Sequence, residues 1–429
     1  MKTFKNFIQE ISNFGILWLT QSFSGLGSAM TNFALILWSY QEKGSALTTA
    51  LLSVCSYAPY VIMSIFAGAL SDKWNKKVTM LVCDSFAAVC TVGIWILLCT
   101  GRLEIWHLYC LNGLNGLMNT IQQPAADVTI TLITPKKYYQ MACGMRSFSN
   151  SLVSILAPAI AGALLTLVNL HAVILFDLFT FAVAFISLLF FVKIPEVQSE
   201  EKDKETLIQS AAKGLMYLKE NRGILHLIFF LAAINLTASV FEAALPAMLL
   251  SRKGGGTMAL GMVNMVTGIA MLAGSLIASV LPAPKSRVRV ICNTLLLSMS
   301  TENFILALGR SVPVWCIGAV LGWISIPLMN ANMDVLFREK IPVAMQGRVY
   351  SVRNTLQFFT IPIGYLLGGL LVDKVFEPFM SMQSPESLLS VIFGTGKGLG
   401  AALLFFVIAI PGILTCVIFR RDKYIYKLE

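Results

Sequence analysis

The chain has 429 residues, of which 56% are hydrophobic and only 13% are charged. Soluble globular chains carry about 25% charged residues, and their cores stop growing near about 250–300 residues, so the composition excludes a water-soluble globular protein. The net charge of +10 does not require a nucleic-acid partner, because basic residues of membrane proteins gather in cytoplasmic loops.

Long stretches without charged residues predict α-helices that cross a lipid bilayer, since each crossing needs about 20 apolar residues. Membrane-spanning β-strands would be shorter and would alternate in polarity. Divided at charged residues and turn signals, the sequence predicts twelve spans. In chain order they cover residues 14–40, 47–70, 78–100, 105–130, 147–169, 172–192, 223–250, 258–281, 290–308, 312–336, 352–374 and 398–419.

A charged segment separates the sixth predicted span from the seventh. Within residues 194–221, acidic residues and lysines interrupt every apolar run, which predicts a linker in water with a surface helix over residues 206–218. The linker divides the chain into an N-terminal six-helix bundle, residues 1–193, and a C-terminal six-helix bundle, residues 222–429.

The basic residues are distributed unevenly between the two sides of the predicted membrane. Of the 32 lysines and arginines, 25 fall in loops on the side of the termini and 7 on the other side. Because cytoplasmic loops carry the excess of Lys and Arg, both termini and the linker are predicted to be cytoplasmic. We therefore expect a multi-pass protein of a bacterial plasma membrane.

An internal repeat relates the two predicted bundles. Asp127 precedes Pro135 by eight residues, and Asp334 precedes Pro342 by the same distance, 207 residues further on. Pro158 and Gly162 in the fifth span are echoed by Pro362 and Gly368 in the eleventh. Repeats of the same orientation predict two halves related by an axis along the membrane normal.

The loop after the second span, residues 68–77 with the sequence GALSDKWNKK, resembles the signature of the major facilitator superfamily, G-x-L-a-D-r-x-G-r-[KR]. Asn75 replaces the usual glycine and is expected to tolerate a left-handed turn. The resemblance implies a conformational latch, in which Asp72 lies against the start of span eleven near Ser351–Asn354 and Lys76 pairs with Asp127. The predicted latch residues are Gly68, Asp72, Lys73, Lys76 and Asp127.

A narrower resemblance rests on Gln122–Ala125, Pro158–Gly162 and Ile341–Val349. These segments are similar to the drug:proton antiporter branch that contains bacterial macrolide efflux proteins. The resemblance implies an all-α fold of twelve transmembrane helices in two pseudo-symmetric bundles. It implies a secondary transporter, not an enzyme, that exports hydrophobic or amphipathic drugs by proton antiport through alternating access. We expect a monomer in the lipid bilayer, with no cofactor, no metal site and no nucleic-acid partner.

Carboxylates inside a membrane are costly and are functional candidates by default. Glu242, in a span expected to line the cavity, is the first candidate to exchange a proton against a cationic substrate, and Asp177 is the second. For Asp177 the alternative is a hydrogen bond between helices. Asp84 is expected to have a structural partner such as Arg146. The remaining acids are Asp127 and Asp334, with predicted gate roles, and Glu302, with a predicted structural hydrogen bond.

Aromatic residues, methionines and amides in four spans predict an adaptable substrate cavity. The candidates are Trp18, Gln21, Asn32, Phe33, Asn235, Phe241, Trp323, Met329, Gln357 and Phe358. Two other functions remain open at this stage. An importer or facilitator of a small polar nutrient would have a more polar cavity, and a lipid scramblase or lysolipid flippase would open sideways to the bilayer.

Overall fold

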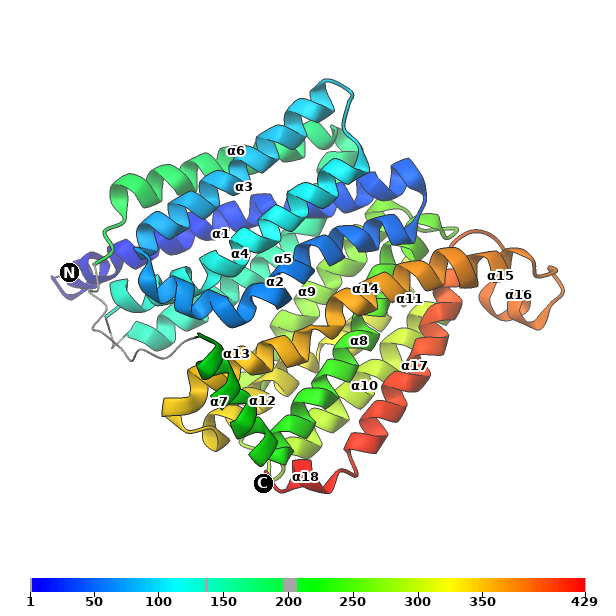
Figure 1. The fold of residues 1–429 in the computed structure, drawn as a ribbon. Coiled ribbons are helices and arrows are strands. Elements are labelled where there is room, and N and C mark those ends of the chain that lie inside the picture. Colours follow the sequence, from blue (N-terminus) through cyan, green and yellow to red (C-terminus); the bar gives the residue numbers. More distant parts are fainter. Residues whose placement is uncertain (1, 136–137, 196–206, 429) are drawn as a thin grey trace.

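The computed structural model describes residues 2–135, 138–195 and 207–428, with side chains except those of residues 2–11, 65–73, 139, 140, 143, 147, 207, 208, 210, 343, 344, 346 and 347. Figure 1 shows long helices that run roughly side by side in two groups, one from each half of the chain. The predicted helical architecture is confirmed.

The N-terminal half contains six long helices. They are α1 (Lys2–Lys43), α2 (Ala46–Lys73), α3 (Lys76–Cys99), α4 (Ile105–Ile133), α5 (Tyr139–Leu167) and α6 (Leu170–Ile186), which continues as the π-helical turn η2 (Ser187–Phe191). The predicted surface helix of the linker is α7 (Leu207–Glu220). It packs on the C-terminal half, where the backbone of Gly214 approaches that of Arg348.

The C-terminal half repeats this plan with more interruptions. Its segments are α8 (Arg222–Ser251), α9 (Thr257–Val280), α10 (Arg287–Leu308), α11 (Val312–Trp323), α12 (Ile326–Lys340), α13 (Val343–Phe358), α14 (Thr360–Leu371), η3 (Val372–Phe376), α15 (Glu377–Ser381), α16 (Leu388–Phe393), α17 (Leu399–Phe419) and α18 (Lys423–Tyr426). The tenth predicted span is α11 plus α12, and the eleventh extends from α13 through α15.

Ten helical segments among the described residues are long and apolar enough to cross a membrane. They account for all the predicted spans except α1 and α4, which have 42 and 29 residues and pack among the others. Both helices carry several amides, such as Asn32 in α1 and Gln122 in α4, and these lower their mean hydropathy. Membrane crossing by α1 and α4 therefore stays a prediction.

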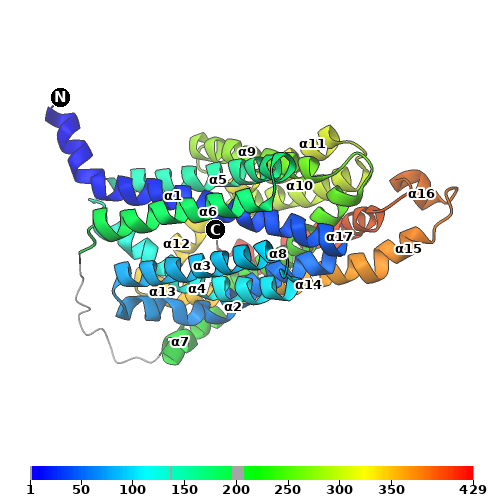
Figure 2. The same cartoon turned by 90° about the horizontal axis from the view of Figure 1, so that it is seen from above.

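The two halves pair their helices in the same order. α1 packs on α5 and α6, as α8 packs on α14 and α17, and α2 packs on α4, as α9 packs on α11 and α12. The halves touch each other mainly through α5 against α9 and α2 against α14. The repeat relates α5 to the span that contains α14, and α2 to α9. It therefore converts one of these contacts into the other, as a two-fold axis requires. Figure 2 shows the same packing from above.

Helix α14 lies between the two halves and touches both through glycines. A Cβ atom at Gly364 or Gly368 would clash with the backbone of α8, at 2.6 Å from Leu236 O and 2.7 Å from Val240 O. At the adjacent Gly369 it would lie 2.6 Å from the Cα atom of Leu47 in α2. Small residues let helix backbones approach this closely in membranes.

The tenth span is broken where α11 ends at Trp323 and α12 begins at Ile326. Pro327 in the first turn of α12 cannot continue a preceding helix, because it lacks the N–H donor. The backbone at the break lies against α9, since a Cβ atom at Gly274 would be 2.1 Å from Ile324 O. The tenth span predicted over residues 312–336 is present as one membrane-crossing segment, Val312–Lys340, with this short break inside it.

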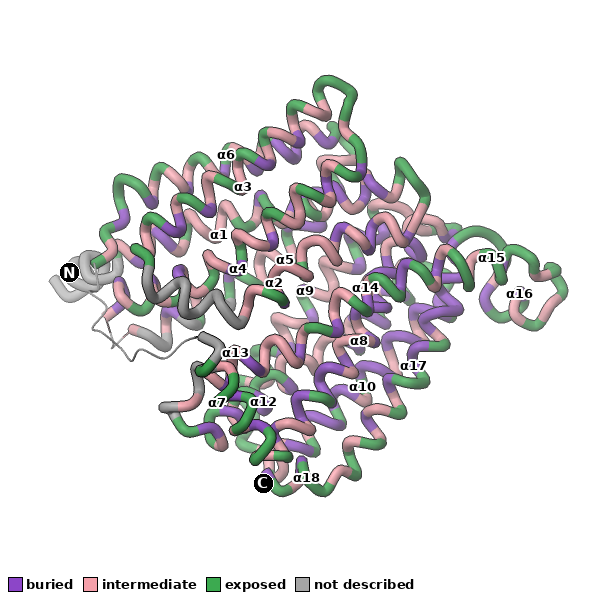
Figure 3. Tube along the Cα trace, viewed as in Figure 1, coloured by how far each residue is buried: buried purple, intermediate pink, exposed green. Residues whose placement is uncertain are grey.

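Apolar side chains cover the outer surface as well as the core. Val89, Phe190, Leu276 and Val280 are all more than 60% exposed, and Figure 3 shows buried residues concentrated on the inward faces of α8, α10 and α17. Exposed apolar surface on this scale is costly in water. It is the outer surface of a protein that lipid surrounds.

Candidate functional site

The predicted latch lies where α2 meets α3. The side chains of Gly68, Asp72 and Lys73 lie outside the described residues. Lys76 Nζ donates a hydrogen bond to the carbonyl oxygen of Trp74 at 3.0 Å. Asn75 does not adopt a left-handed turn: its backbone is extended, and its Oδ1 accepts hydrogen bonds from the backbone of Lys77 and Val78. Asparagine suits this position because its side chain caps the helix that follows.

Asp127, at the end of α4, forms an ion pair with Arg146 of α5. From the sequence we expected Arg146 to pair with Asp84, and Lys76 to pair with Asp127. The observed ion pair between Arg146 and Asp127 differs from both expectations. The start of span eleven also differs, because α13 begins at Val343 and continues through Ser351–Asn354. An acidic side chain packed against Ser351–Asn354 would therefore contact the middle of α13 and not its N-terminus. The latch itself stays a prediction.

The half-buried carboxylate of Asp84 has two amide partners. Gln122 Nε2 donates to its Oδ1 at 2.6 Å, and Gln21 Nε2 donates to its Oδ2 at 3.3 Å. The neighbouring Trp18 donates its indole N–H to the carbonyl oxygen of Met145 at 2.9 Å. Trp18 and Gln21 therefore stabilise the N-terminal bundle internally, and they line neither of the two cavities described below.

Asp177 lies at the contact of α6 with α1. It is 5% exposed, its Oδ1 accepts a hydrogen bond from Ser28 Oγ at 3.0 Å, and the backbone of Gly27 packs against it. It lines neither of the two cavities. Its geometry corresponds to the alternative named from the sequence, a hydrogen bond between helices.

Hydrogen bonds join the two halves at the end of the bundles that holds residues 43–45 and 377–398, which we call the distal end. Asp373 of η3 accepts hydrogen bonds from Ser45 Oγ at 2.6 Å and from the backbone N–H groups of Ala46 at 3.0 Å and Leu47 at 2.9 Å. Tyr40 Oη lies 2.6 Å from Ser251 Oγ. A carboxylate of one half therefore caps the N-terminus of α2 in the other half, and these bonds hold the two halves together at the distal end.

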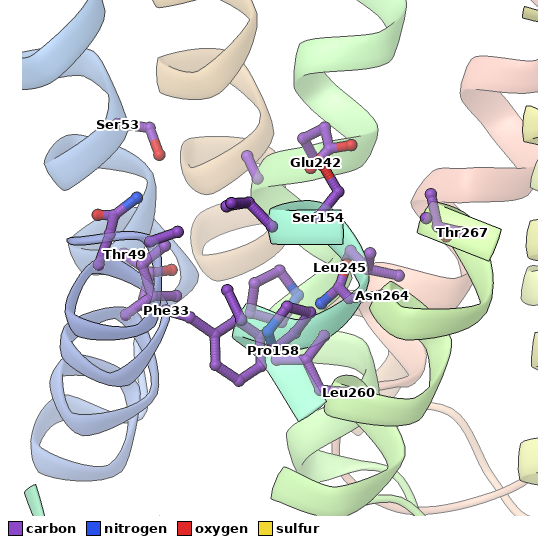
Figure 4. Close-up of a pocket in the computed structure, with 18 of the residues that line it drawn as sticks. Phe33, Thr49, Ser53, Ser154, Pro158, Glu242, Leu245, Leu260, Asn264 and Thr267 are labelled. Atoms are coloured by element: carbon purple, nitrogen blue, oxygen red, sulfur yellow. The ribbon is translucent and has the colours of Figure 1, made fainter. Parts of the chain in front are cut away.

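A cavity of about 380 Å³ lies between the halves. We call it the central cavity. Its walls come from α1, α2 and α5 of one half and from α8, α9, α11 and α14 of the other. Figure 4 shows Glu242 of α8 among side chains from both halves, including Ser154 of α5 and Thr267 of α9. Within the described residues, no hydrogen bond or ion pair engages the Glu242 carboxylate.

A second cavity of about 380 Å³ lies within the C-terminal half, and we call it the C-bundle cavity. Only α8, α10, α11, α12 and α13 line it. Glu242 and Trp323 line both cavities, so the two spaces adjoin at these side chains. Glu302 of α10 also lines the second cavity, and its Oε1 accepts a hydrogen bond from Trp323 Nε1 at 2.8 Å.

Most of the predicted cavity residues line one of these spaces. The central cavity contains Asn32, Phe33 and Trp323, and the C-bundle cavity contains Asn235, Phe241, Trp323, Met329, Gln357 and Phe358. The structural hydrogen bond predicted for Glu302 is present as the bond from Trp323, but the position of Glu302 at a cavity was not predicted, because the ninth span was expected to be peripheral. It also missed Asn264 and Thr267 of α9, although polar residues three apart on one helix face were a usable signal.

Comparison with known proteins identifies relatives over most of the chain. Macrolide efflux protein A of Streptococcus pyogenes is 22% identical over 366 residues, which cover 84% of this chain and 90% of that protein. Multidrug efflux pump Tap of Mycolicibacterium fortuitum is 21% identical over 384 residues, which cover 86% of this chain and 92% of that protein.

Solved structures share the fold. The nucleoside transporter NupG matches with a TM-score of 0.66 at 14% identity, over 96% of this chain and 99% of that one. A POT family transporter in complex with 5-aminolevulinic acid matches with a TM-score of 0.70 at 13% identity, over 94% of each chain. The family model described as Major Facilitator Superfamily matches residues 17–365. With its helical bundles, lipid-facing surface and enclosed cavities, the chain belongs to the major facilitator superfamily of membrane transporters.

Proposed function

We propose that this transporter exports amphipathic, macrolide-like cations in exchange for protons, by alternating access between two six-helix bundles. The observation that carries the proposal is the position of Glu242. It is a carboxylate without a hydrogen-bond or ion-pair partner among the described residues, in a cavity that both halves line. Such a group can bind a proton, and a cationic substrate bound nearby favours release of that proton.

The charge distribution supports the orientation of the transporter in the membrane, and the efflux names of its relatives support outward transport. The excess of lysines and arginines on the side of the termini supports a cytoplasmic location for both termini. The distal end, where Asp373 and Tyr40 join the two halves, is then the outer end. In this state a substrate enters from the cytoplasm, and release requires the distal hydrogen bonds to break.

The relatives support the substrate class. Two of them carry the names macrolide efflux protein and multidrug efflux pump, and the walls of the two cavities are aromatic and methionine-rich. Phe33 lines the central cavity, and Phe241, Met299, Met329 and Met333 line the C-bundle cavity. Aromatic and thioether side chains form surfaces that adapt to apolar molecules of different shape.

The test is substrate-driven proton release from proteoliposomes that contain a pH-sensitive dye. We expect addition of a basic macrolide to release protons through the wild-type protein and not through Glu242→Gln. Asp84→Asn is the matched control, because it also removes a carboxylate within a membrane span, but one that lines neither cavity. Proton release by Glu242→Gln at the wild-type rate would eliminate Glu242 as the proton carrier. Macrolide transport without proton movement in the wild type would eliminate antiport.

A further inference from the structure

The C-bundle cavity contains a second carboxylate that no ion pair neutralises. Glu302 is 5% exposed, and its hydrogen-bond partner among the described residues is the indole N–H of Trp323. Among the described residues, neither Glu302 nor Glu242 forms a salt bridge. Two acids that line one cavity, with no basic side chain bonded to them, can each bind a proton or a cationic ligand.

An unsatisfied acceptor lies beside these acids. Asn303 is 2% exposed and lines the C-bundle cavity. Its Nδ2 donates to the carbonyl oxygen of Met299 at 3.2 Å, whereas its buried Oδ1 accepts no hydrogen bond. A buried acceptor without a donor costs free energy, so native proteins rarely leave one empty. A ligand with an N–H group would supply the missing donor.

The remaining walls favour an organic cation over a metal ion. Phe241, Trp323 and Phe358 contribute aromatic rings, and Met299, Met329 and Met333 contribute thioethers. Alkali and alkaline-earth ions prefer cages built from oxygen atoms. Aromatic faces instead attract ammonium groups that have already lost most of their water.

The one arginine of the cavity is held away from the acids. Arg353 Nε donates to Gln357 Oε1 at 3.0 Å, and its guanidinium lies 4.3 Å from the ring centroid of Phe337. A hydrogen bond from Asn235 of α8 to the carbonyl oxygen of Gln357 in α13 shows that these two residues lie at the same height along the bundle. With a rise of about 1.5 Å per residue, Arg353 and Glu242 are separated by roughly 16 Å along the bundle. The positive charge is at one end and the acids are at the other.

We propose that the C-bundle cavity is the binding site for the protonated amine of an exported amphiphile, with Glu302 as its counter-ion and Asn303 Oδ1 as an acceptor. The apolar remainder of the molecule occupies the central cavity, past the shared wall of Glu242 and Trp323. This inference rests on the proposed export of amphipathic cations. It adds that recognition of the charge takes place inside one bundle, on a carboxylate separate from the proton carrier.

The experiment compares a macrolide that bears a dimethylamino sugar with its N-oxide, which has the same shape and no net charge. Binding of each radiolabelled compound to purified protein in lipid nanodiscs is measured for the wild type and for Glu302→Gln, Glu302→Asp and Asp84→Asn. We expect the wild type to bind the amine more tightly than the N-oxide. We expect Glu302→Gln to weaken amine binding by about 10- to 100-fold, the size of one charge-assisted hydrogen bond, and to leave N-oxide binding unchanged.

The other variants separate charge from structure. Glu302→Asp keeps the charge and should retain the preference for the amine, and Asp84→Asn should bind both compounds as the wild type does. If Glu302→Gln does not fold, the inference is still tested by whether the wild type and Glu302→Asp bind the amine more tightly than the N-oxide. Replacing KCl with NaCl at constant ionic strength provides a further arm, and sodium competition that depends on Glu302 would overturn the inference in favour of a metal-ion site.

The outcomes distinguish this inference from the proposed function. Equal binding and export of both compounds by the wild type would overturn the amine site and leave drug export intact. Proton-coupled export of the amine by Glu302→Gln with unchanged affinity would do the same. Export of neither compound by the wild type would overturn the proposed function, and the amine site with it.

Discussion

Carboxylates within the bundles have two kinds of environment. Asp84 accepts hydrogen bonds from two glutamines and Asp177 accepts one from a serine, so both connect helices within one bundle. Glu242 and Glu302 line cavities, where a ligand or a proton can reach them. At the level of single residues, the position of an acid relative to a cavity therefore separates structural acids from functional candidates.

Asp422, in the segment that follows α17, provides a prediction on stability. It lies 2.7 Å from His226 Nδ1 and also accepts a hydrogen bond from the backbone N–H of Tyr424. Burial raises the pKa of the Asp422 carboxyl, but the hydrogen bonds from His226 and Tyr424 outweigh it and hold the pKa below its usual value. The stabilisation is therefore present above the unfolded-state pKa of about 3.9 and is lost as the pH falls through the folded-state value.

We expect Asp422→Asn to lower the free energy of unfolding by about 1 kcal/mol near neutral pH. The difference from the wild type should shrink as the pH falls below about 4. Thermal unfolding in detergent, measured over this pH range, checks both parts. Glu386→Gln, an exposed acid between α15 and α16, is the control and should follow the wild type. A difference that stays constant with pH would contradict the assigned cause.

At the level of elements, helices α5 and α9 form the most extensive contact between the halves. A Cβ atom at Gly268 of α9 would lie 2.7 Å from Ile155 Cγ1 and 3.0 Å from Ile155 N. At Gly162 of α5 the nearest atom would be 3.9 Å away. The two glycines face the same inter-half contact with very different clearance.

We expect Gly268→Ala to reduce transport strongly, because the added methyl group forces α5 and α9 apart. Gly162→Ala should transport as the wild type does, since its methyl group fits without displacement. Drug uptake into everted vesicles, normalised to the amount of protein in the membrane, gives the comparison. Equal activity of the two variants would mean that this contact can open without loss of function.

Arginines at equivalent positions of the two halves have different partners. The offset of 207 residues that relates Asp127 to Asp334 also relates Arg146 to Arg353. Arg146 pairs with its aspartate, whereas Arg353 bonds Gln357 inside the C-bundle cavity. The same sequence position therefore provides an ion pair in one half and part of a cavity wall in the other.

Helix positions could be predicted from the sequence more fully than the cavities. Runs of apolar residues between charged ones place most helix ends within a few residues of those observed, since the thickness of the bilayer sets helix length. The break after Trp323 was missed, although Pro327 marks it. Trp18 and Gln21 were assigned to a cavity, and Glu302 was predicted to form a hydrogen bond between helices but not to line a cavity, because the face that each helix turns inward depends on tertiary packing and not on local sequence.

On the scale of the whole molecule, the two halves are held together at one end by polar bonds that can be exchanged for water. Asp373 alone accepts three hydrogen bonds from α2. In an open distal end these groups would bond water, so the net cost of opening is a fraction of their gross strength. Such a connection is stable enough to hold the halves together and weak enough to reverse.

We expect Asp373→Asn to shift the protein towards states with an open distal end, because the charged acceptor at the start of α2 is lost. Spin labels at Lys43 and Lys253, both exposed at this end, would report longer distances in double electron–electron resonance. Glu386→Gln again serves as the control. An unchanged distance distribution in Asp373→Asn would show that other contacts keep the distal end closed.

The glycines of α14 constrain how the bundles can move. Gly368 rests on α8 of its own bundle and Gly369 rests on α2 of the opposite bundle, although the two are neighbours in the chain. Helix α14 therefore packs closely against a helix of each bundle, on adjacent faces. A displacement of either bundle along or around α14 would change its contact with the other bundle. In the proposed alternating-access cycle, the two bundles would therefore rock about an axis that runs beside α14.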